Sequence, residues 1–372
     1  MASSLFDYLP QELEEQFVSW GLPPYRARQV QEWVYGRRVN SWQAMTNLSL
    51  ELRERLECEL RFSTLVLEET LEAKDGETTK FLWSLQDGLQ VESVLIRAPG
   101  RRTVCVSTQV GCPARCAFCA SGRQGLIRDL SAAEILEQVW QIQRALDPIG
   151  ERVTHVVYMG MGEPLRNYDA VVRSIRMLQH PQMLSLGARR ITVSTVGVLE
   201  NMVRLAEENL GVSLVLSLHA PNQNLRRKII PYARHYELED LVEAMDAFAT
   251  LSGRDPTYEY ILLAGLNDRE EHARELVSLL RGRRGVVNLI PYNPVPGLRL
   301  SRPTPSAIMD FRNVLDHGGI LNTCRYTKGD DIAAACGQLA MRESNKAALP
   351  LAKSASCAAK REESESLSLS VV

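Results

Sequence analysis

The chain has 372 residues, of which 45% are hydrophobic and 24% are charged, and its formal net charge is -2. This composition is ordinary for a globular protein of about two domains that can bury a large core. A near-neutral charge excludes binding to nucleic acid through a global positive field, so any such surface must be a local basic patch.

The sequence contains no apolar run of the length that a membrane-spanning helix requires. Its first residues also lack the basic start and apolar stretch of a secretion signal. We therefore expect a cytoplasmic protein without a membrane partner. In that compartment the eight cysteines indicate metal ligands or reactive thiols before structural disulfides.

Residues 1–62 show apolar positions at helical spacing, for example Leu13, Phe17 and Trp20. We predict a small helical accessory domain there. Residues 63–97 change to a strand pattern with a turn at Gln86-Asp-Gly88, which predicts a linking β-hairpin.

Residues 98–343 alternate apolar, strand-like runs with helical stretches. The runs are 104–110, 153–159, 190–195, 212–218, 258–263 and 286–290. Strands that alternate with helices predict an α/β fold with a parallel sheet, and six such units suit a barrel or a partial barrel. Residues 344–372 are rich in serine, alanine and charge, which predicts a disordered tail.

Three cysteines, Cys112, Cys116 and Cys119, follow the first run with the spacing C-x3-C-x2-C. One short loop of this kind can hold a single iron–sulfur cluster by three thiolates and leave the fourth iron open. An open iron suits a cluster that binds and cleaves S-adenosylmethionine, so the loop indicates radical chemistry. A structural zinc site is the alternative, but such sites normally use a second ligand pair, which is absent here.

Active sites of such barrels gather after the strands, so residues that follow the other runs are candidates. Gly162 and Glu163 lie in the loop Gly160-Met-Gly-Glu-Pro164, where glycines let backbone approach a ligand and a carboxylate accepts a bond from an ammonium group. A tight βα turn is the alternative reading of this loop.

Four polar residues lie at or just after the ends of later runs, namely Ser194, Ser217, His219 and Asn293. They would bring hydroxyl, imidazole and amide groups to the same end of the barrel. A structural histidine and a turn-forming asparagine are the alternatives for His219 and Asn293.

Several motifs in this order resemble one known family. They are Cys105-Val-Ser-Thr-Gln-Val-Gly-Cys112, the Gly-Met-Gly-Glu-Pro loop, Ser217-Leu-His-Ala-Pro-Asn222, Asn288-Leu-Ile-Pro-Tyr-Asn-Pro294 and the Gly329 to Leu339 segment with its Ala-Cys-Gly-Gln-Leu end. Together they resemble the RlmN/Cfr family of radical SAM RNA methyltransferases, and the RlmN branch most closely. The resemblance spans about residues 5–339. It implies a radical SAM partial (βα)6-type barrel with the helical domain and hairpin described above.

The resemblance implies a role for each matching residue. Cys112, Cys116 and Cys119 match the ligands of one [4Fe-4S] cluster. The positions that match S-adenosylmethionine contacts are Gly162, Glu163, Ser194, Ser217, Leu218, His219 and Asn293. Cys336 matches the cysteine that is first methylated, Cys105 its resolving partner in a transient disulfide, and Glu92 the proton acceptor.

The implied reaction adds a methyl group to C2 of an adenosine, and the family's targets are adenosine 2503 of 23S ribosomal RNA and adenosine 37 of transfer RNA. C2 of adenine is too weak a nucleophile to attack a sulfonium methyl group. A radical must therefore form on methylated Cys336 and add to the ring, which uses two S-adenosylmethionine molecules per turnover. The resulting covalent adduct is released when the Cys105 thiolate attacks the Cys336 sulfur.

The implied partners are 23S ribosomal RNA, transfer RNA and an electron donor such as flavodoxin or ferredoxin, and we expect a monomer. Local basic clusters are candidates for phosphate contacts: Arg101-Arg102, Arg123, Arg128, Arg226-Arg-Lys228 and Arg281-Gly-Arg-Arg284. In the accessory domain the candidates are Tyr25-Arg-Ala-Arg28. Two other functions stay open, namely Cfr-type methylation at C8 and a non-catalytic iron–sulfur protein that binds RNA.

Overall fold

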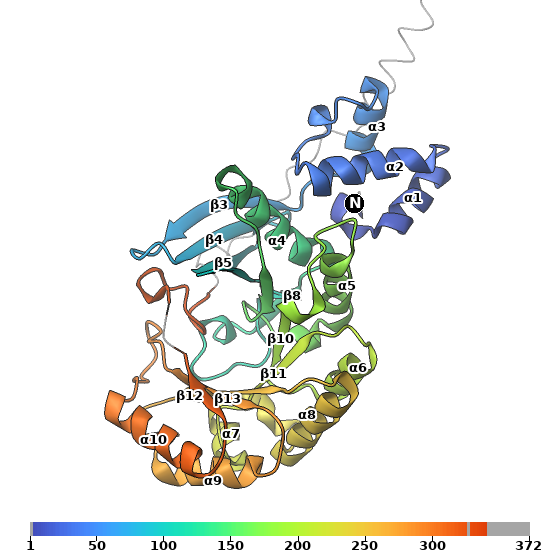
Figure 1. Cartoon of the computed structure of the whole chain (residues 1–372). Coiled ribbons are helices and arrows are strands. Elements are labelled where there is room, and N and C mark those ends of the chain that lie inside the picture. Colours follow the sequence, from blue (N-terminus) through green and yellow to red (C-terminus); the bar gives the residue numbers. More distant parts are fainter. Residues whose placement is uncertain (1–2, 326–327, 341–372) are drawn as a thin grey trace, which may run out of the picture.

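A ten-stranded sheet forms the centre of the computed structural model, which describes residues 3–325 and 328–340 (Figure 1). The predicted disordered tail, 344–372, lies outside the described residues. No helix within the described ranges has the length and apolar character needed to cross a bilayer.

Seven strands of the sheet are parallel neighbours in chain order. They are β6 (Arg101–Cys105), β9 (His155–Tyr158), β10 (Ile191–Thr195), β11 (Ser213–Ser217), β12 (Thr257–Leu262), β13 (Val286–Pro291) and β14 (Asn322–Cys324). The helices between them are α4 (Ala132–Leu146), α5 (Tyr168–Gln179), α6 (Leu199–Glu207), α7 (Gln223–Ile229), α8 (Leu238–Ser252), α9 (Glu270–Leu280) and α10 (Pro305–His317). This confirms the predicted partial barrel, because the described edge strands, β14 and β3, do not pair with each other.

The first predicted strand, 104–110, is in fact divided in two, so its prediction as one continuous run was wrong. Strand β6 ends at Cys105, and β7 (Gln109–Gly111) pairs separately with β8 (Leu126–Asp129). The intervening residues bond to the next βα loop: the Val106 carbonyl accepts from Gly160 N at 3.0 Å, and Thr108 N donates to the Met161 carbonyl. Because of these bonds, the chain leaves the ten-stranded sheet before the cysteine loop begins.

Three antiparallel strands extend the sheet beyond β6. They are β3 (Leu65–Glu72), β4 (Thr78–Leu85) and β5 (Gln90–Ala98), and β5 pairs with β6. The two strands of the predicted hairpin are therefore β4 and β5. Because they continue the barrel sheet, side chains of β5 lie beside those of β6.

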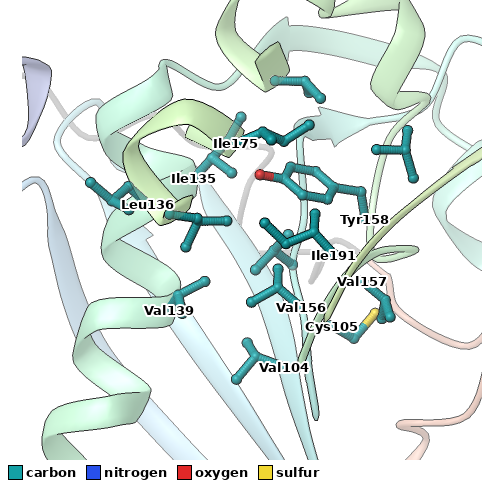
Figure 2. Packing of buried hydrophobic residues seen from close by; sticks show 14 of the residues in the cluster. Val104, Cys105, Ile135, Leu136, Val139, Val156, Val157, Tyr158, Ile175 and Ile191 are labelled. Atoms are coloured by element: carbon teal, nitrogen blue, oxygen red, sulfur yellow. The ribbon is translucent and has the colours of Figure 1, made fainter. Parts of the chain in front are cut away.

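Alternation along the strands separates the core from the site. Val104 and Val156 face α4 and pack against its apolar side chains, as Figure 2 shows. The next residues, Cys105 and Val157, line the cavity on the other face of the sheet. The same pairing of strands therefore buries the core and presents a thiol to the barrel interior.

The N-terminal helices pack on the outside of the barrel against α4 and α5 (Figure 1). They are α1 (Pro10–Ser19), α2 (Pro24–Gln31) and α3 (Leu50–Glu59), with the short helices η1 (Leu5–Asp7), η2 (Glu32–Gly36) and η3 (Trp42–Ala44) and the paired strands β1 (Ser3–Ser4) and β2 (Leu60–Arg61). The Trp140 ring lies 5.2 Å from that of Phe6, and its N–H donates to the Val34 carbonyl at 2.9 Å. This buried contact fixes the helical domain to the barrel.

Candidate active site

A cavity of about 780 Å³ opens at the barrel interior. Its wall includes the thiol-bearing residues Cys105, Cys119 and Cys336 together with Asn293. Four of the predicted site residues thus line one cavity, although they come from distant parts of the sequence.

The backbone of the cysteine loop has positive φ angles and close contacts that favour glycine at specific positions. Gly111 has φ of +81°, and a Cβ there would lie 1.9 Å from the Gly125 carbonyl oxygen. Arg115 also has a positive φ, of 53°, and Gly122 passes close to its Cα. Ala117 N donates to the Ile229 carbonyl, which docks the loop on the end of α7. The three thiols lie near enough for charge on one to affect ionisation of another.

The three sulfurs fit an iron–sulfur cluster. Burial raises the pKa of the Cys112 thiol to about 12, and burial, with the charges of Cys119 and Cys112, raises the pKa of Cys116. Backbone N–H groups face two of the sulfurs: those of Ala114 and Arg115 face Cys112, and others face Cys119. Such donors suit bound thiolates, and a metal deprotonates its thiol ligands outright.

Within the described ranges, no three side chains of His, Cys, Asp or Glu are grouped as a single metal ion requires. A four-iron cluster differs from one ion because its thiolates bind separate irons. A structural zinc ion would need a fourth protein ligand beside these three cysteines.

The loop after β9 touches the residues that precede the cysteines. A Cβ on Gly160 would lie 2.6 Å from the Val106 carbonyl, and one on Gly162, whose φ is +109°, would lie 2.6 Å from the Thr108 hydroxyl. Both positions therefore require glycine. The close packing fixes the βα loop against the strand-to-loop segment that leads to the cysteines.

The Glu163 carboxylate is buried and already accepts three bonds within the chain. Its donors are Leu165 N, the Thr195 hydroxyl and Val196 N. Burial raises the pKa of Glu163, and these donors oppose that rise. A carboxylate has about four acceptor positions, so one is left for a ligand. Glu163 thus links the loops that follow β9 and β10 by hydrogen bonds.

Ser194 and Ser217 end neighbouring strands, and their hydroxyl oxygens lie 3.3 Å apart. Both Ser194 and Asn288 donate to the carboxylate of Glu259, which is only 7% exposed. Burial raises the pKa of Glu259, although Arg325 and these donors lower it. Glu259 therefore orients the serine pair from the floor of the cavity.

His219 is a buried, neutral imidazole. Its Nδ1 accepts from Ile261 N at 3.0 Å, so the ring proton is on Nε2. Burial, with Arg226 nearby, lowers the pKa of His219 to about 3. The ring stands edge to face against Phe118 at 4.9 Å, so His219 supports the cysteine loop as well as the predicted cofactor site. Leu218 is fully buried beside it.

Asn293 joins the β13 loop to the segment that carries Cys336. Its side-chain amide donates to the Cys336 carbonyl at 3.3 Å, and its oxygen accepts from Arg302. The same segment is fixed to the cysteine loop, because Ala120 N donates to the Gly337 carbonyl and the Ser121 hydroxyl to that of Leu339.

Cys105 and Cys336 share the cavity wall, and neither is in a disulfide. Burial, followed by the charge of Cys336, raises the pKa of Cys105 to about 12, while Arg325 opposes the rise. Cys336 is likewise the main cause of the raised pKa of Arg325, with Glu259 and Cys105 adding to it. The guanidinium of Arg325 thus lies among two thiols and a carboxylate.

Glu92, on β5, is buried outside the cavity wall. One carboxylate oxygen lies 3.1 Å from Lys80 Nζ, and the other accepts from Ala340 N at 3.1 Å. Lys80 Nζ also donates to the Ala333 carbonyl. This ion pair therefore holds the Cys336 segment against β4 and β5 (Figure 1).

Most of the basic clusters are neutralised by acidic partners rather than free for phosphate. Arg102 pairs with Glu151, Arg128 with Asp87 and Glu134, Arg227 with Glu237, Arg283 with Asp246, and Arg284 with Asp255. The prediction of a phosphate contact at Arg226 is wrong, since its side chain is fully buried. At the cavity wall the cations are Arg101, Arg325 and Lys328.

Three site residues escaped the sequence analysis: Glu259, Arg325 and Lys80. Glu259 stands in an apolar strand run, where a charged residue is unusual and signals a buried role. Arg325 and Lys80 give no comparable local signal, because their partners lie far away in the sequence.

Comparison with known proteins agrees with this geometry. Residues 106–277 match the model of the Radical SAM superfamily, and residues 3–61 match that of the ribosomal RNA large subunit methyltransferase N-terminal domain. A protein of Protochlamydia amoebophila, named "Probable dual-specificity RNA methyltransferase RlmN 2", is 57% identical over 93% of this chain and 97% of its own length.

A Lysinibacillus sphaericus protein named "Probable dual-specificity RNA methyltransferase RlmN" is 44% identical over 92% of this chain and 90% of its own. The crystal structure of a radical SAM methyltransferase from Sphaerobacter thermophilus superposes with a TM-score of 0.89 at 44% identity, covering 91% of this chain and 99% of that one. The chain therefore belongs to the RlmN family of radical SAM RNA methyltransferases.

Proposed function

We propose that this protein methylates C2 of adenosine in both 23S ribosomal RNA and transfer RNA, with Cys336 as the carrier of the transferred carbon. The observation that supports this most is the common cavity of Cys336, Cys105 and the cysteine loop. A carrier, its resolving thiol and a cluster loop are the parts that a two-stage transfer needs in one place.

Cys112, Cys116 and Cys119 would hold one [4Fe-4S] cluster, and its fourth iron would be left to S-adenosylmethionine. The bound cluster supplies the electron for reductive cleavage of S-adenosylmethionine. The chain would use two such molecules per turnover, one to methylate Cys336 and one for radical formation.

The S-adenosylmethionine site would be formed by the loops that follow β9, β10, β11 and β13. Gly162 keeps the loop after β9 packed against Thr108, Glu163 keeps one acceptor position, and the Ser194–Ser217 pair offers hydroxyl groups. Leu218, His219 and Asn293 complete the set by packing and hydrogen bonding.

Cys105 would release the product by attack on the Cys336 sulfur, so that a transient disulfide forms as the sulfur–methylene bond breaks and the released carbon takes a solvent proton. The unpaired electron of the adduct would return to the bound cluster, and a thiol reductant would then reduce the disulfide. The attack needs the Cys105 thiolate, and the pKa of about 12 keeps its fraction small at neutral pH. Arg325 opposes that rise, so its positive charge favours the reactive form.

Glu92 would accept the proton lost from adenine C2. Its carboxylate is paired with Lys80, and both are less than 10% exposed. Because Ala340 N binds the same carboxylate, movement of the Cys336 segment would change its hydrogen bonding. The protein would act as a monomer and take its electron from a flavodoxin or ferredoxin.

The test is anaerobic reconstitution with iron, sulfide and a reductant, followed by incubation with S-adenosylmethionine and each RNA class separately. We expect 2-methyladenosine in both RNA classes and none with the Cys336→Ala variant. Formation of 8-methyladenosine would instead identify the Cfr-type outcome, and cleavage of S-adenosylmethionine without RNA methylation would contradict the proposal.

A further inference from the structure

The side chain of Arg226, on α7, is buried as completely as any charged group described in the molecule. Its Nε donates to the Leu218 carbonyl at 3.1 Å, and Nη2 donates to the carbonyls of Ser217 and Val196. These carbonyls belong to the loops that leave β10 and β11. The backbone therefore fixes the guanidinium directly behind the predicted S-adenosylmethionine site.

Nη1 of the same guanidinium is buried and has no hydrogen-bond partner within the described part of the chain. An unsatisfied buried N–H is costly, and more so on a charged group. Three carbonyl dipoles do not neutralise a full charge. A missing anionic partner would account for both the open donor and the uncompensated charge.

The position of that partner follows from the residues around Arg226. Cys116 and Cys119 pack against the apolar cluster that Leu225 and Ile229 of α7 form with Phe118. The cysteine loop also docks on this helix through Ala117 N and the Ile229 carbonyl.

We infer that Arg226 is the counter-charge of the iron–sulfur cluster, with Nη1 donating to a sulfide of the bound cluster. The inference rests on the proposed ligation by the three cysteines. It makes Arg226 a positioning residue that acts through the cluster. It also explains why a cation predicted for the RNA surface is buried.

A fixed positive charge beside a cluster favours the reduced, more negative state. Arg226→Gln should therefore shift the reduction potential of the cluster to a more negative value. Arg226→Lys keeps the charge and should stay closer to the wild-type potential. Arg227→Gln is the matched control, because Arg227 is the next residue on α7 but is half-exposed and paired with Glu237.

The experiment is an anaerobic redox titration of the reconstituted full chain without S-adenosylmethionine, followed by electron paramagnetic resonance. Cluster formation in the wild-type protein tests the ligand set, and the difference between variants tests Arg226. Equal potentials for wild type, Arg226→Gln and Arg227→Gln would overturn the inference. If the potentials are equal and only S-adenosylmethionine binding weakens, Arg226 instead contacts that cosubstrate.

A second measurement needs no folded glutamine variant. Wild-type protein labelled with ¹⁵N-arginine should show a magnetic coupling between an arginine nitrogen and the reduced cluster. The coupling should persist in Arg227→Gln and be lost in Arg226→Lys. Absence of any arginine coupling in the wild-type protein would contradict a hydrogen bond to the cluster sulfur.

Discussion

At the scale of single residues, the sequence predicted best what is local. The C-x3-C-x2-C spacing sets the ligand loop within eight residues, so the pattern itself indicates the chemistry. Arg226, Arg325 and Glu259 matter because of residues that are distant in the sequence. Arg226 lies in a basic run and resembles a surface cation, and only the fold shows that it is enclosed.

Cys105→Ala should trap a covalent protein–RNA adduct, because Cys119, the other cysteine beside Cys336 in the cavity wall, would be held by the proposed cluster and could not release the product. The measurement is a denaturing gel with labelled RNA after anaerobic turnover. Cys324→Ala is the control, since that cysteine is on β14 and does not line the cavity. Recovery of free protein and normally methylated RNA would refute the role of Cys105.

His219 should make folding stability depend on pH in the acid range. Its pKa in the folded protein is about 3, below the value of 6.5 for a free histidine, so the unfolded chain binds a proton that the folded chain excludes. This contribution is fully present above pH 6.5 and is lost progressively as the pH falls toward 3.

The variant for this test is His219→Asn, which offers an acceptor near Nδ1 and tolerates the φ of 57°. Thermal unfolding from pH 7 to pH 4 should show a steeper loss of stability in the wild-type protein than in the variant. Parallel curves for the two proteins would show that His219 does not titrate as argued.

At the scale of elements, strand and helix alternation predicted the parallel half of the sheet. The break after Cys105 was missed because Val106 to Thr108 have a strand-like sequence but bond to a loop more than fifty residues away. The hairpin pattern likewise could not show that β5 pairs with β6. Pairing between strands uses backbone hydrogen-bonding groups, which differ little from residue to residue, so the side-chain pattern does not reveal which strands pair.

Trp140 on α4 fixes the accessory domain to the barrel. Its replacement should separate the accessory domain from the barrel. Trp140→Ala should lower the free energy of unfolding by about 3–5 kcal/mol, the usual cost of removing a large buried aromatic. Chemical denaturation measures this. Trp20→Ala, at a half-buried position, should cost clearly less, and an equal loss in both variants would contradict the special role of Trp140.

Tyr25, the second residue of α2, has an exposed ring, and the Arg26 guanidinium lies 4.9 Å from the ring centre. Stacking of an RNA base on such a ring contributes about 1–3 kcal/mol. Tyr25→Ala should therefore weaken RNA binding by roughly 5- to 150-fold. Met309→Ala, an exposed apolar position on α10, should leave the affinity unchanged in a filter-binding assay. Equal RNA affinities of Tyr25→Ala and wild type would contradict a contact between Tyr25 and RNA.

At the scale of the whole molecule, the fold brings three separate parts of the chain to one cavity. The proposed cluster loop follows β7, and Cys105, the proposed resolving thiol, ends β6. Cys336, the proposed carrier, lies beyond β14 on a segment held by Asn293, Ser121 and the Lys80–Glu92 pair. The family resemblance predicted their roles. The cavity supplies the physical reason that those roles can operate together.

Passage of the carbon through Cys336 as a methylene radical can be followed with S-adenosylmethionine that carries a trideuterated methyl group. One deuterium should leave with 5′-deoxyadenosine, and a solvent proton should complete the new methyl group. Mass spectrometry should then find 2-methyladenosine with two deuterium atoms. Transfer of all three deuterium atoms to the product would contradict the mechanism.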